Sequence, residues 1–491
     1  MVCSKCGCEE FKITERKTAR DGSEKYRQRC KSCGASKSIK IPPKVKSESK
    51  KYVITSCQND VGVNRNFFES IKLFTELNDC ELIVLKTTSL TVDNITEPPI
   101  WGVSEDYLVE DSFDIGDSVR VLASIRVSNT MVNPLSGMDD LAMGKHIIVA
   151  NNQLQMKTLF SESVEKPIFA YTTGTISHPK YTQTKTGFKA KRNHTYSFLY
   201  VEVRDEKTFI RDITSDESGC FYDITGYYSP SGYNPIDSIS ALVTGDEHAV
   251  KTDTHVSFVT YYAEDSIVNV LKPKYIVRHD VLDFYSGSHH HENDFILKYS
   301  KSLTSEDNVE RELFETYRFI KQTTPSFSEN IIVESNHNEH LRKWLNLFDH
   351  RKDPRNAKLY FGLMYTMMKN IEEGNHVSPF EAYCRMFRDD HSLEFTQRDK
   401  GKLISGVEVS YHGDRGANGT RGSIAQFAKT GKKYVIGHSH SPKIEKGCYQ
   451  VGTSTSRLEY ATGLTTWANT HCVIYPNGQC QLLTINSGGW R

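Results

Sequence analysis

The chain has 491 residues, of which 37% are hydrophobic and 25% charged, and its 61 Lys and Arg balance 61 Asp and Glu. This composition is typical of folded globular proteins and excludes a disordered or collagen-like chain. No run of about 18 apolar residues occurs, so we expect neither a membrane-spanning helix nor a membrane partner.

The length exceeds what one ordinary core supports, so we expect two to four domains. The amino terminus lacks the apolar stretch of a signal peptide. Most of the 12 cysteines are scattered along the chain, which favours a reducing compartment over a disulfide framework. We therefore predict a cytoplasmic protein, which means the host cytoplasm if the chain is encoded by a phage.

Residues 1–42 carry two C-x2-C-G pairs, which can present four thiolates to one tetrahedral zinc ion. The four cysteines are Cys3, Cys6, Cys30 and Cys33. A hairpin turn at Asp21-Gly22 fits between the pairs. The pattern predicts a zinc ribbon with one structural zinc, and the role of the fifth thiol, Cys8, stays open. Residues 26–33 resemble the ribbons that begin some insertion-sequence transposases.

The expected ribbon is basic. Residues 1–51 contain 15 Lys and Arg against 6 Asp and Glu, whereas the rest of the chain contains 46 against 55. A basic segment on an acidic body favours contact with DNA. A purely structural ribbon, or one that binds a protein partner, is the alternative, and a homo-oligomer is also left open.

Residues 43–51 have the composition of a linker, because a proline pair is followed by charged residues. In the region 52–234, an apolar run at 52–55, a helical pattern at 67–77 and a second run at 82–85 predict a parallel β-α-β unit. Further strands are expected at 146–150, 168–171, 198–203 and 221–224. This α/β region is either a separate domain or the front half of one sandwich.

Residues 178–194 contain five basic residues and no acid, with Tyr181 and Phe188 among them. The basic residues are Lys180, Lys185, Lys189, Lys191 and Arg192. Aromatic rings stack on bases while cations neutralise phosphates, so this segment is a candidate DNA contact. The alternative is a solvated mobile loop.

Five blocks in the second half of the chain place potential metal ligands shortly after short apolar runs. They are Asp246-Glu247-His248, His279-Asp280, Asn336-His337, His412-Gly413 and Gly437-His438-Ser439-His440. Loops at the ends of strands can bring such distant residues into one site. Carboxylate, imidazole and amide ligands suit Mn, Fe or Zn better than Mg or Ca. One block alone would be an ordinary cap or loop residue, but five together predict a metal site.

The order of these blocks resembles the calcineurin-like metallophosphoesterases, nearest the SbcD-type DNA nucleases and phage DNA-degradation proteins. The resemblance covers a catalytic domain at 235–491. It implies an α/β fold, a four-layer αββα sandwich, and the residue pattern adds a helical insertion at about residues 350–390. Helical patterns occur at 306–322, 338–347, 354–373 and 378–389, and an Asn-Gly turn predicts a hairpin over 472–485.

The resemblance also implies two divalent metals at the active site, with Mn favoured and Fe or Zn as alternatives. It assigns the first metal to Asp246, His248, Asp280 and His440. It assigns the second metal to Asp280, Asn336, His412 and His438, so that Asp280 bridges the two ions. His337 matches the family's catalytic histidine, which acts as a general acid or stabilises charge on the phosphoryl group.

Three positions depart from the family's pattern. His279 and Val250 occupy positions where glycine is usual. Asn338 occupies the position of the usual acidic residue, and the acid Glu339 follows one place later. These changes affect loop geometry and neighbours of the ligands rather than the ligands. The polar segment 286–294 contains three consecutive histidines, which either touch phosphate or a metal or simply line the rim.

Together these features predict a dinuclear-metal-dependent phosphodiesterase, a DNA nuclease that cleaves phosphodiester bonds with a metal-activated hydroxide. The first alternative is a nucleotide or small-molecule phosphoesterase, because such a site alone does not name its substrate. The second is a DNA- or protein-binding module with a vestigial metal site.

Overall fold

The computed structural model describes residues 11–18, 24–30, 33, 35–41, 49–87, 102–204, 207–459 and 461–491. The chain divides into two compact units, Met1–Ser49 and Lys50–Arg491. In the first unit, β1 (Phe11–Thr18), β2 (Glu24–Cys30) and β3 (Ser36–Ile41) form an antiparallel sheet. Cys3 and Cys6 lie outside the described residues, so the zinc ribbon stays a prediction.

The predicted β-α-β unit is confirmed. β4 (Lys50–Gln58) and β5 (Glu81–Thr87) pair in parallel and are joined by α1 (Arg65–Asn78). The side chain of Asn64 caps the helix by accepting a hydrogen bond from the backbone N–H of Phe67. The buried face of α1 consists of Phe67, Phe68, Ser70, Ile71 and Phe74, so the periodic apolar stripe seen in the sequence packs against the sheet.

The second unit, Lys50–Arg491, contains three larger sheets. The first has the order β13 (Lys207–Thr214), β12 (Ser197–Arg204), β4, β5 and β6 (Leu108–Val109). The second has the order β20 (Glu394–Phe395), β19 (Glu329–Ile332), β18 (Tyr275–Arg278), β17 (Ala241–Val243), β26 (Thr470–Ile474) and β27 (Cys480–Thr484). In this second sheet, β17 to β20 are parallel, and β26 and β27 form the predicted hairpin.

The third sheet has ten strands and joins two distant parts of the sequence. From one edge, its strands are β21 (Leu403–Ile404), β22 (Val407–Glu408), β23 (Lys433–Ile436), β25 (Cys448–Gln450), β24 (Lys443–Glu445), β10 (Met156–Leu159), β11 (Ile168–Thr172), β9 (His146–Val149), β8 (Val119–Val121) and β7 (Phe113–Ile115). A small antiparallel sheet contains β14 (Phe221–Asp223), β15 (Gly226–Ser229) and β16 (Gly232–Pro235). The strands expected near 146, 168, 198 and 221 are thus confirmed.

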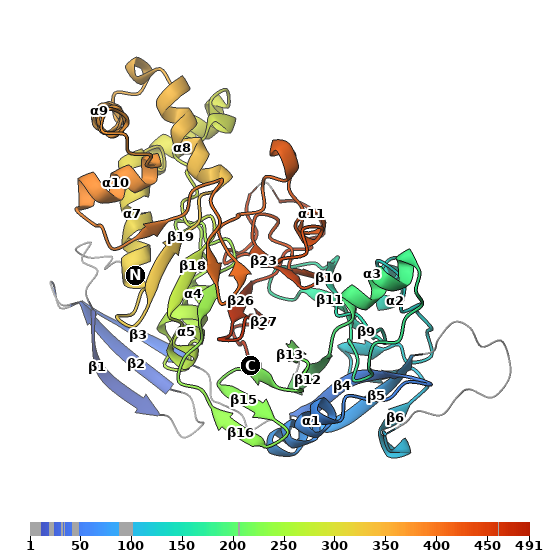
Figure 1. Cartoon of the computed structure of the whole chain (residues 1–491). Helices are drawn as coiled ribbons and strands as arrows, with labels where there is room; N and C mark the ends of the chain where they lie inside the picture. Colours follow the sequence, from blue (N-terminus) through green and yellow to red (C-terminus); the bar gives the residue numbers. More distant parts are fainter. Residues whose placement is uncertain are drawn as a thin grey trace. The chain divides into compact units, whose positions relative to one another are not determined.

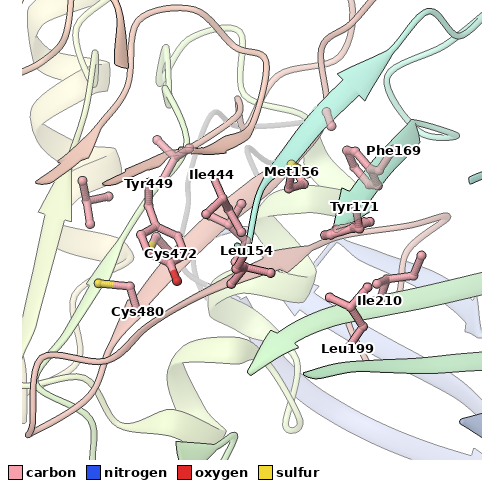
Figure 2. Close-up of a cluster of buried hydrophobic side chains, with 14 of the residues drawn as sticks. Leu154, Met156, Phe169, Tyr171, Leu199, Ile210, Ile444, Tyr449, Cys472 and Cys480 are labelled. Atoms are coloured by element: carbon pink, nitrogen blue, oxygen red, sulfur yellow. The ribbon is translucent and has the colours of Figure 1, made fainter. Parts of the chain in front are cut away.

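One buried core connects the three larger sheets. Figure 2 shows Leu199 of β12 and Ile210 of β13 near Tyr171 of β11, while Tyr449 of β25 lies close to Cys472 of β26. Burial of such apolar surface, at about 25 cal/mol per Å², is the main stabilising term in this region. The mixed α/β class is therefore confirmed, whereas the four-layer order of the sandwich stays a prediction.

Five longer helices lie between β18 and β20 in the sequence. They are α6 (Phe295–Thr304), α7 (Val309–Gln322), α8 (Asn336–Leu347), α9 (Ala357–Glu372) and α10 (Pro379–Arg388). Figure 1 shows α7, α8, α9 and α10 gathered beside β18 and β19. The four predicted helices of this region are confirmed. Helix α6 was not predicted, and its apolar side chains Phe295, Ile296, Tyr299 and Leu303 are exposed rather than buried.

The remaining helices are short. They are α2 (Asp139–Ala142), α3 (Lys185–Asn193), α4 (Thr254–Ser257), α5 (Ile267–Leu271), α11 (Ile424–Ala428), a π-helix (Phe258–Tyr262) and 3-10 turns at Glu105–Tyr107, His289–His291, His350–Lys352 and Ala417–Gly419. The interpretation of 178–194 as a loop is wrong in part, because Thr184 caps α3 and half of the segment is helical. In the described part of the chain, no helix has the length and apolar character that a membrane span requires.

Candidate metal centre

The predicted ligand blocks follow the ends of strands in two sheets. β17, β18 and β19 are parallel neighbours, so their carboxyl ends lie at one edge of the six-stranded sheet. Asp246, Asp280 and Asn336 follow these three ends. β22 and β23 are likewise parallel in the ten-stranded sheet, and His412 and His438 follow them. The topology therefore directs five separate segments toward one place.

One group of four buried residues is formed by Asp246, His248, Asp280 and His440, each of which offers a ligand atom within 4.8 Å of the others. The Nε2 atom of His440 lies 3.1 Å from Oδ2 of Asp246 and 3.2 Å from Nε2 of His248. These are the four residues that the family resemblance assigns to the first metal. The geometry brings them together, and such a group can hold a metal ion.

A second group contains Asp280, His412 and His438, again with ligand atoms within 4.8 Å of one another. Nε2 of His412 lies 2.9 Å from Oδ2 of Asp280. Asn336, the fourth residue assigned to the second metal, has a buried Oδ1. Asp280 belongs to both groups, as a bridging ligand would.

The polar atoms of this cluster fit a bound cation. Oδ1 of Asp246, Oδ1 of Asp280 and Oδ1 of Asn336 are buried and have no hydrogen-bond partner among the residues that the structure describes. An unpaired buried carboxylate is costly, and paired or metal-bound carboxylates are the usual resolution. Carboxylate, imidazole and amide donors together match the preferences of first-row divalent metals.

Electrostatics keep the two carboxylates in the ionised form that binds metal. Burial alone would raise the pKa of Asp280, but His412 and His337 outweigh burial and hold that pKa well below its usual value. The pKa of Asp246 is lowered in the same way by His412 and His440, again against burial. Burial lowers the pKa of His438 and of His440, which favours the neutral imidazole that a metal requires.

The backbone at the site is strained. His248, Asp280, His438 and His440 have φ of 42°, 42°, 75° and 57°, a left-handed conformation that non-glycine residues rarely adopt. Such residues cost about 1–3 kcal/mol each and persist only where the surroundings fix them. The loops after β17 and β18 fix one another, because the N–H of His248 donates to the carbonyl of Asp280 over 2.8 Å.

Gly437 lets two chain segments approach closely. A Cβ at this position would lie 2.3 Å from Oδ1 of Asp246 and 3.0 Å from the ring of His279. Both distances are shorter than ordinary contacts, so a side chain here would displace a predicted ligand. The lack of space for a side chain thus explains why the Gly437-His438-Ser439-His440 block begins with glycine.

Asp283 orients two residues of the site and was not predicted from the sequence. Its carboxylate accepts a hydrogen bond from Nδ1 of His248 over 2.8 Å. Its main-chain oxygen accepts one from Nδ1 of His337 over 2.6 Å. The Nε2 atom of His337 then lies 3.9 Å from Oδ2 of Asp280. The position of Asp283, three residues after Asp280, was the only signal available in the sequence.

A buried ion pair supports the loops after β17 and β18. Nη1 of Arg278 donates to Oε1 of Glu247 over 2.8 Å, and both side chains are fully buried. Arg278 also donates to Oδ1 of Asn330 on β19. Removing one partner of such a pair is strongly destabilising. A charged residue at the end of β18, directly after its apolar run, was the sequence signal for this pair.

The positions that depart from the family's pattern have contacts of their own. Glu339 forms ion pairs with Arg415 and, at 3.5 Å, with Arg398. His279 packs near Asp246 and His412, and its Nδ1 lies 3.2 Å from Nδ1 of His412. Beside His412 lies a cavity of about 320 Å³ whose lining includes Arg398, Asp414 and Arg415.

The five predicted DNA contacts lie on or next to α3, and all five are exposed. Lys180 forms an ion pair with Asp60 at 2.7 Å. Arg192 contacts the carbonyl of Ala428 on α11 over 3.5 Å. Lys185, Lys189 and Lys191 form no ion pair within the described residues. The ring of Phe188 is 72% exposed.

The fold and this buried cluster define a mixed α/β protein with a candidate metal centre. No family model and no solved structure matches the chain. Protein A1 of Escherichia phage T5 is 31% identical over 469 residues, which cover 90% of this chain and 83% of that protein. The chain therefore belongs to the family of Protein A1.

Proposed function

We propose that this chain is a dinuclear-metal-dependent phosphodiesterase of the calcineurin-like type, folded as a four-layer αββα sandwich, and that DNA is its substrate. The observation that carries the proposal is the position of Asp280, which belongs to both groups of potential metal ligands. A shared carboxylate between two imidazole-rich groups is the arrangement of a dinuclear site. Bound divalent ions would neutralise charge on a phosphate and lower the pKa of a water molecule.

His337 has the geometry of a general acid at this site. Its Nδ1–H donates to the carbonyl of Asp283, which fixes the ring and leaves Nε2 directed toward Asp280. A proton on Nε2 could pass to the leaving oxygen of a phosphodiester held at the centre. The ring is half-buried rather than enclosed, so solvent can reach it between turnovers.

Exposed positive charge favours DNA as the substrate. Lys185, Lys189 and Lys191 stand exposed on α3, and the exposed ring of Phe188 lies among them. Arg192 connects the end of α3 to α11, which directly precedes β23 and His438. The basic residues 1–51 add a second positive segment. The host cytoplasm, where phage DNA resides, is the proposed location.

The test is a cleavage assay with Mn²⁺ on plasmid, linear double-stranded and single-stranded DNA, beside p-nitrophenyl phosphate mono- and diesters. We expect cleavage of at least one DNA form, and a loss of about 10²–10⁴-fold in the variant His337→Ala with unchanged metal content. The matched control is His376→Ala, because His376 is an exposed histidine outside the cluster.

Two outcomes would contradict the proposed cleavage of DNA. Hydrolysis of small esters with intact DNA would favour a small-molecule or nucleotide phosphoesterase, which the cavity of about 320 Å³ beside His412 could serve. Full metal content without turnover of any substrate would favour a binding module.

A further inference from the structure

A second cluster of imidazoles lies apart from the residues assigned to the two metals. It consists of His289, His290 and His340, and one ring nitrogen of each lies within 4.8 Å of the others. The ring centroids are 4.0 Å apart for His289 and His290, and 4.9 Å apart for His289 and His340. We call these three residues the histidine trio.

Two elements hold the trio in place. His289 and His290 lie in the 3-10 turn His289–His291, which follows the loop of Asp280. His340 lies on α8, one turn beyond His337, and residues three apart share a face of a helix. The rings of His337 and His340 are 5.1 Å apart, so the trio borders the proposed general acid.

One ring nitrogen of the trio makes no hydrogen bond within the described residues. Nδ1 of His289 is buried and has no hydrogen-bond partner in the part of the chain that the structure describes. Leaving a buried polar atom unpaired is costly, and a metal ion at this atom would offset that cost.

We propose that the histidine trio binds one zinc ion that is separate from the dinuclear centre. Three imidazoles with one open position form a common tetrahedral zinc site. Zn–N bonds of about 2.0–2.1 Å place the donor nitrogens roughly 3.3 Å apart, so the side chains need only small rotations to close on an ion. His290 is exposed, so the open position is accessible to water or to a phosphate oxygen.

Neighbouring residues define the limits of this site. His291 is excluded from it, because its Nδ1 contacts Nζ of Lys301 over 2.7 Å. Lys343 is a positive neighbour of both His289 and His340 and opposes cation binding. Lys343 is exposed, so solvent screens its charge, and Lys343→Gln should strengthen zinc binding.

The experiment counts zinc ions per chain in the full-length protein, by elemental analysis after saturation with Zn²⁺ and removal of unbound metal. We expect His290→Ala and His340→Ala each to lose one zinc. The double variant should also lose one rather than two, because both residues serve the same ion. His291→Ala is the matched control from the same turn and should lose none.

The zinc site of the trio does not depend on the proposed function. A test in the Asp280→Asn variant separates the two. That variant should weaken the dinuclear centre, and adding His290→Ala to it should still remove one further zinc. An unchanged zinc count in His290→Ala, or a loss of two ions in the double variant, would overturn the trio as a site. Because His290 is exposed, this variant remains decisive even if His340→Ala fails to fold.

Discussion

Oδ1 of Asp283 lies 2.8 Å from Nδ1 of His248, and this hydrogen bond fixes the imidazole whose Nε2 faces His440. Burial opposes a charged His248, but Asp283 and the nearby carboxylates outweigh burial and raise the pKa of that imidazole to about 9. A metal at Nε2 must therefore displace a proton, while Asp283 keeps the proton on Nδ1. Asp283 thus sets the tautomer in which His248 can bind metal.

The first prediction concerns this contact. Asp283→Asn removes the negative charge but leaves the main-chain oxygen that holds His337, so metal affinity should fall about 10–100-fold. Titration of the metal-free protein with Mn²⁺ measures the change. Asp140→Asn, at an exposed acid on α2, is the control and should bind metal as the parent does. Equal affinities in Asp283→Asn and the parent would remove Asp283 from this role.

The second prediction concerns Gly437. In Gly437→Ala, the new methyl group would meet Oδ1 of Asp246 at 2.3 Å, so the loop after β23 must shift. We expect a stability loss of about 1–3 kcal/mol, as for other overpacked sites, together with weaker metal binding. Thermal unfolding and metal analysis measure both effects. Gly62→Ala is the control, because its nearest neighbour would be 3.9 Å away; a wild-type metal content in Gly437→Ala would contradict the steric argument.

Much of the candidate centre could be predicted from the sequence, because each ligand block closely follows a short apolar run. Parallel strands such as β17 and β18 then place Asp246 and Asp280 at the same sheet edge. Asp283 could not be predicted in this way, because its role depends on the path of the loop after β18. A short polar side chain that contacts other side chains leaves no periodic signal in the sequence.

The fold, like the candidate centre, could be predicted from the sequence only in part. The β-α-β unit was predictable because α1 buries one regular apolar face. The ten-stranded sheet was not, because β10 and β24 are antiparallel neighbours although almost 300 residues separate them: Lys157 pairs with Lys443. Helix α6 was missed because its apolar residues Phe295 and Ile296 are exposed, which departs from the usual pattern.

The third prediction tests whether one carboxylate serves both groups. Asp280→Asn keeps the size of the side chain but removes the charge that both groups share. We expect it to lower the occupancy of both metals together, whereas Asn336→Ala should affect one metal only. Metal content after dialysis against a weak chelator distinguishes these results. Equal metal content in Asp280→Asn and the parent would refute the bridge.

The fourth prediction concerns stability and pH. Asp212 is buried on β13, and burial raises its pKa to about 8. Between pH 3.8 and about 8 the unfolded chain is ionised at this residue while the folded chain keeps the proton. The unfolded state then binds fewer protons, so this group makes stability fall as pH rises, by about 1.4 kcal/mol for each pH unit.

Asp212→Asn removes this titration and keeps an oxygen that can accept from the N–H of Leu482. The variant should therefore gain stability relative to the parent between pH 5 and pH 8, and the gain should grow with pH. Chemical denaturation at several pH values measures the difference. A difference that does not change with pH would show that Asp212 is ionised in the folded protein.

The fifth prediction concerns the basic face of α3. Replacing Lys185, Lys189 and Lys191 with Gln removes three exposed charges that have no ion pair in the described part of the chain. If these lysines contact phosphates, DNA binding should weaken and its salt dependence should become shallower, by about 0.9 in the log–log slope for each lost contact. Hydrolysis of small esters should stay unchanged, because the substitutions lie outside the metal centre.

Fluorescence anisotropy of labelled DNA at several salt concentrations measures this slope. The control replaces three other exposed lysines, Lys352, Lys358 and Lys369, which lie near or on α9. It changes the net charge by the same amount, so any general effect of charge appears in both variants. A slope that falls equally in the two variants would show that α3 acts through the overall field of the protein, whereas a fall confined to the α3 variant requires direct contact with the phosphate backbone.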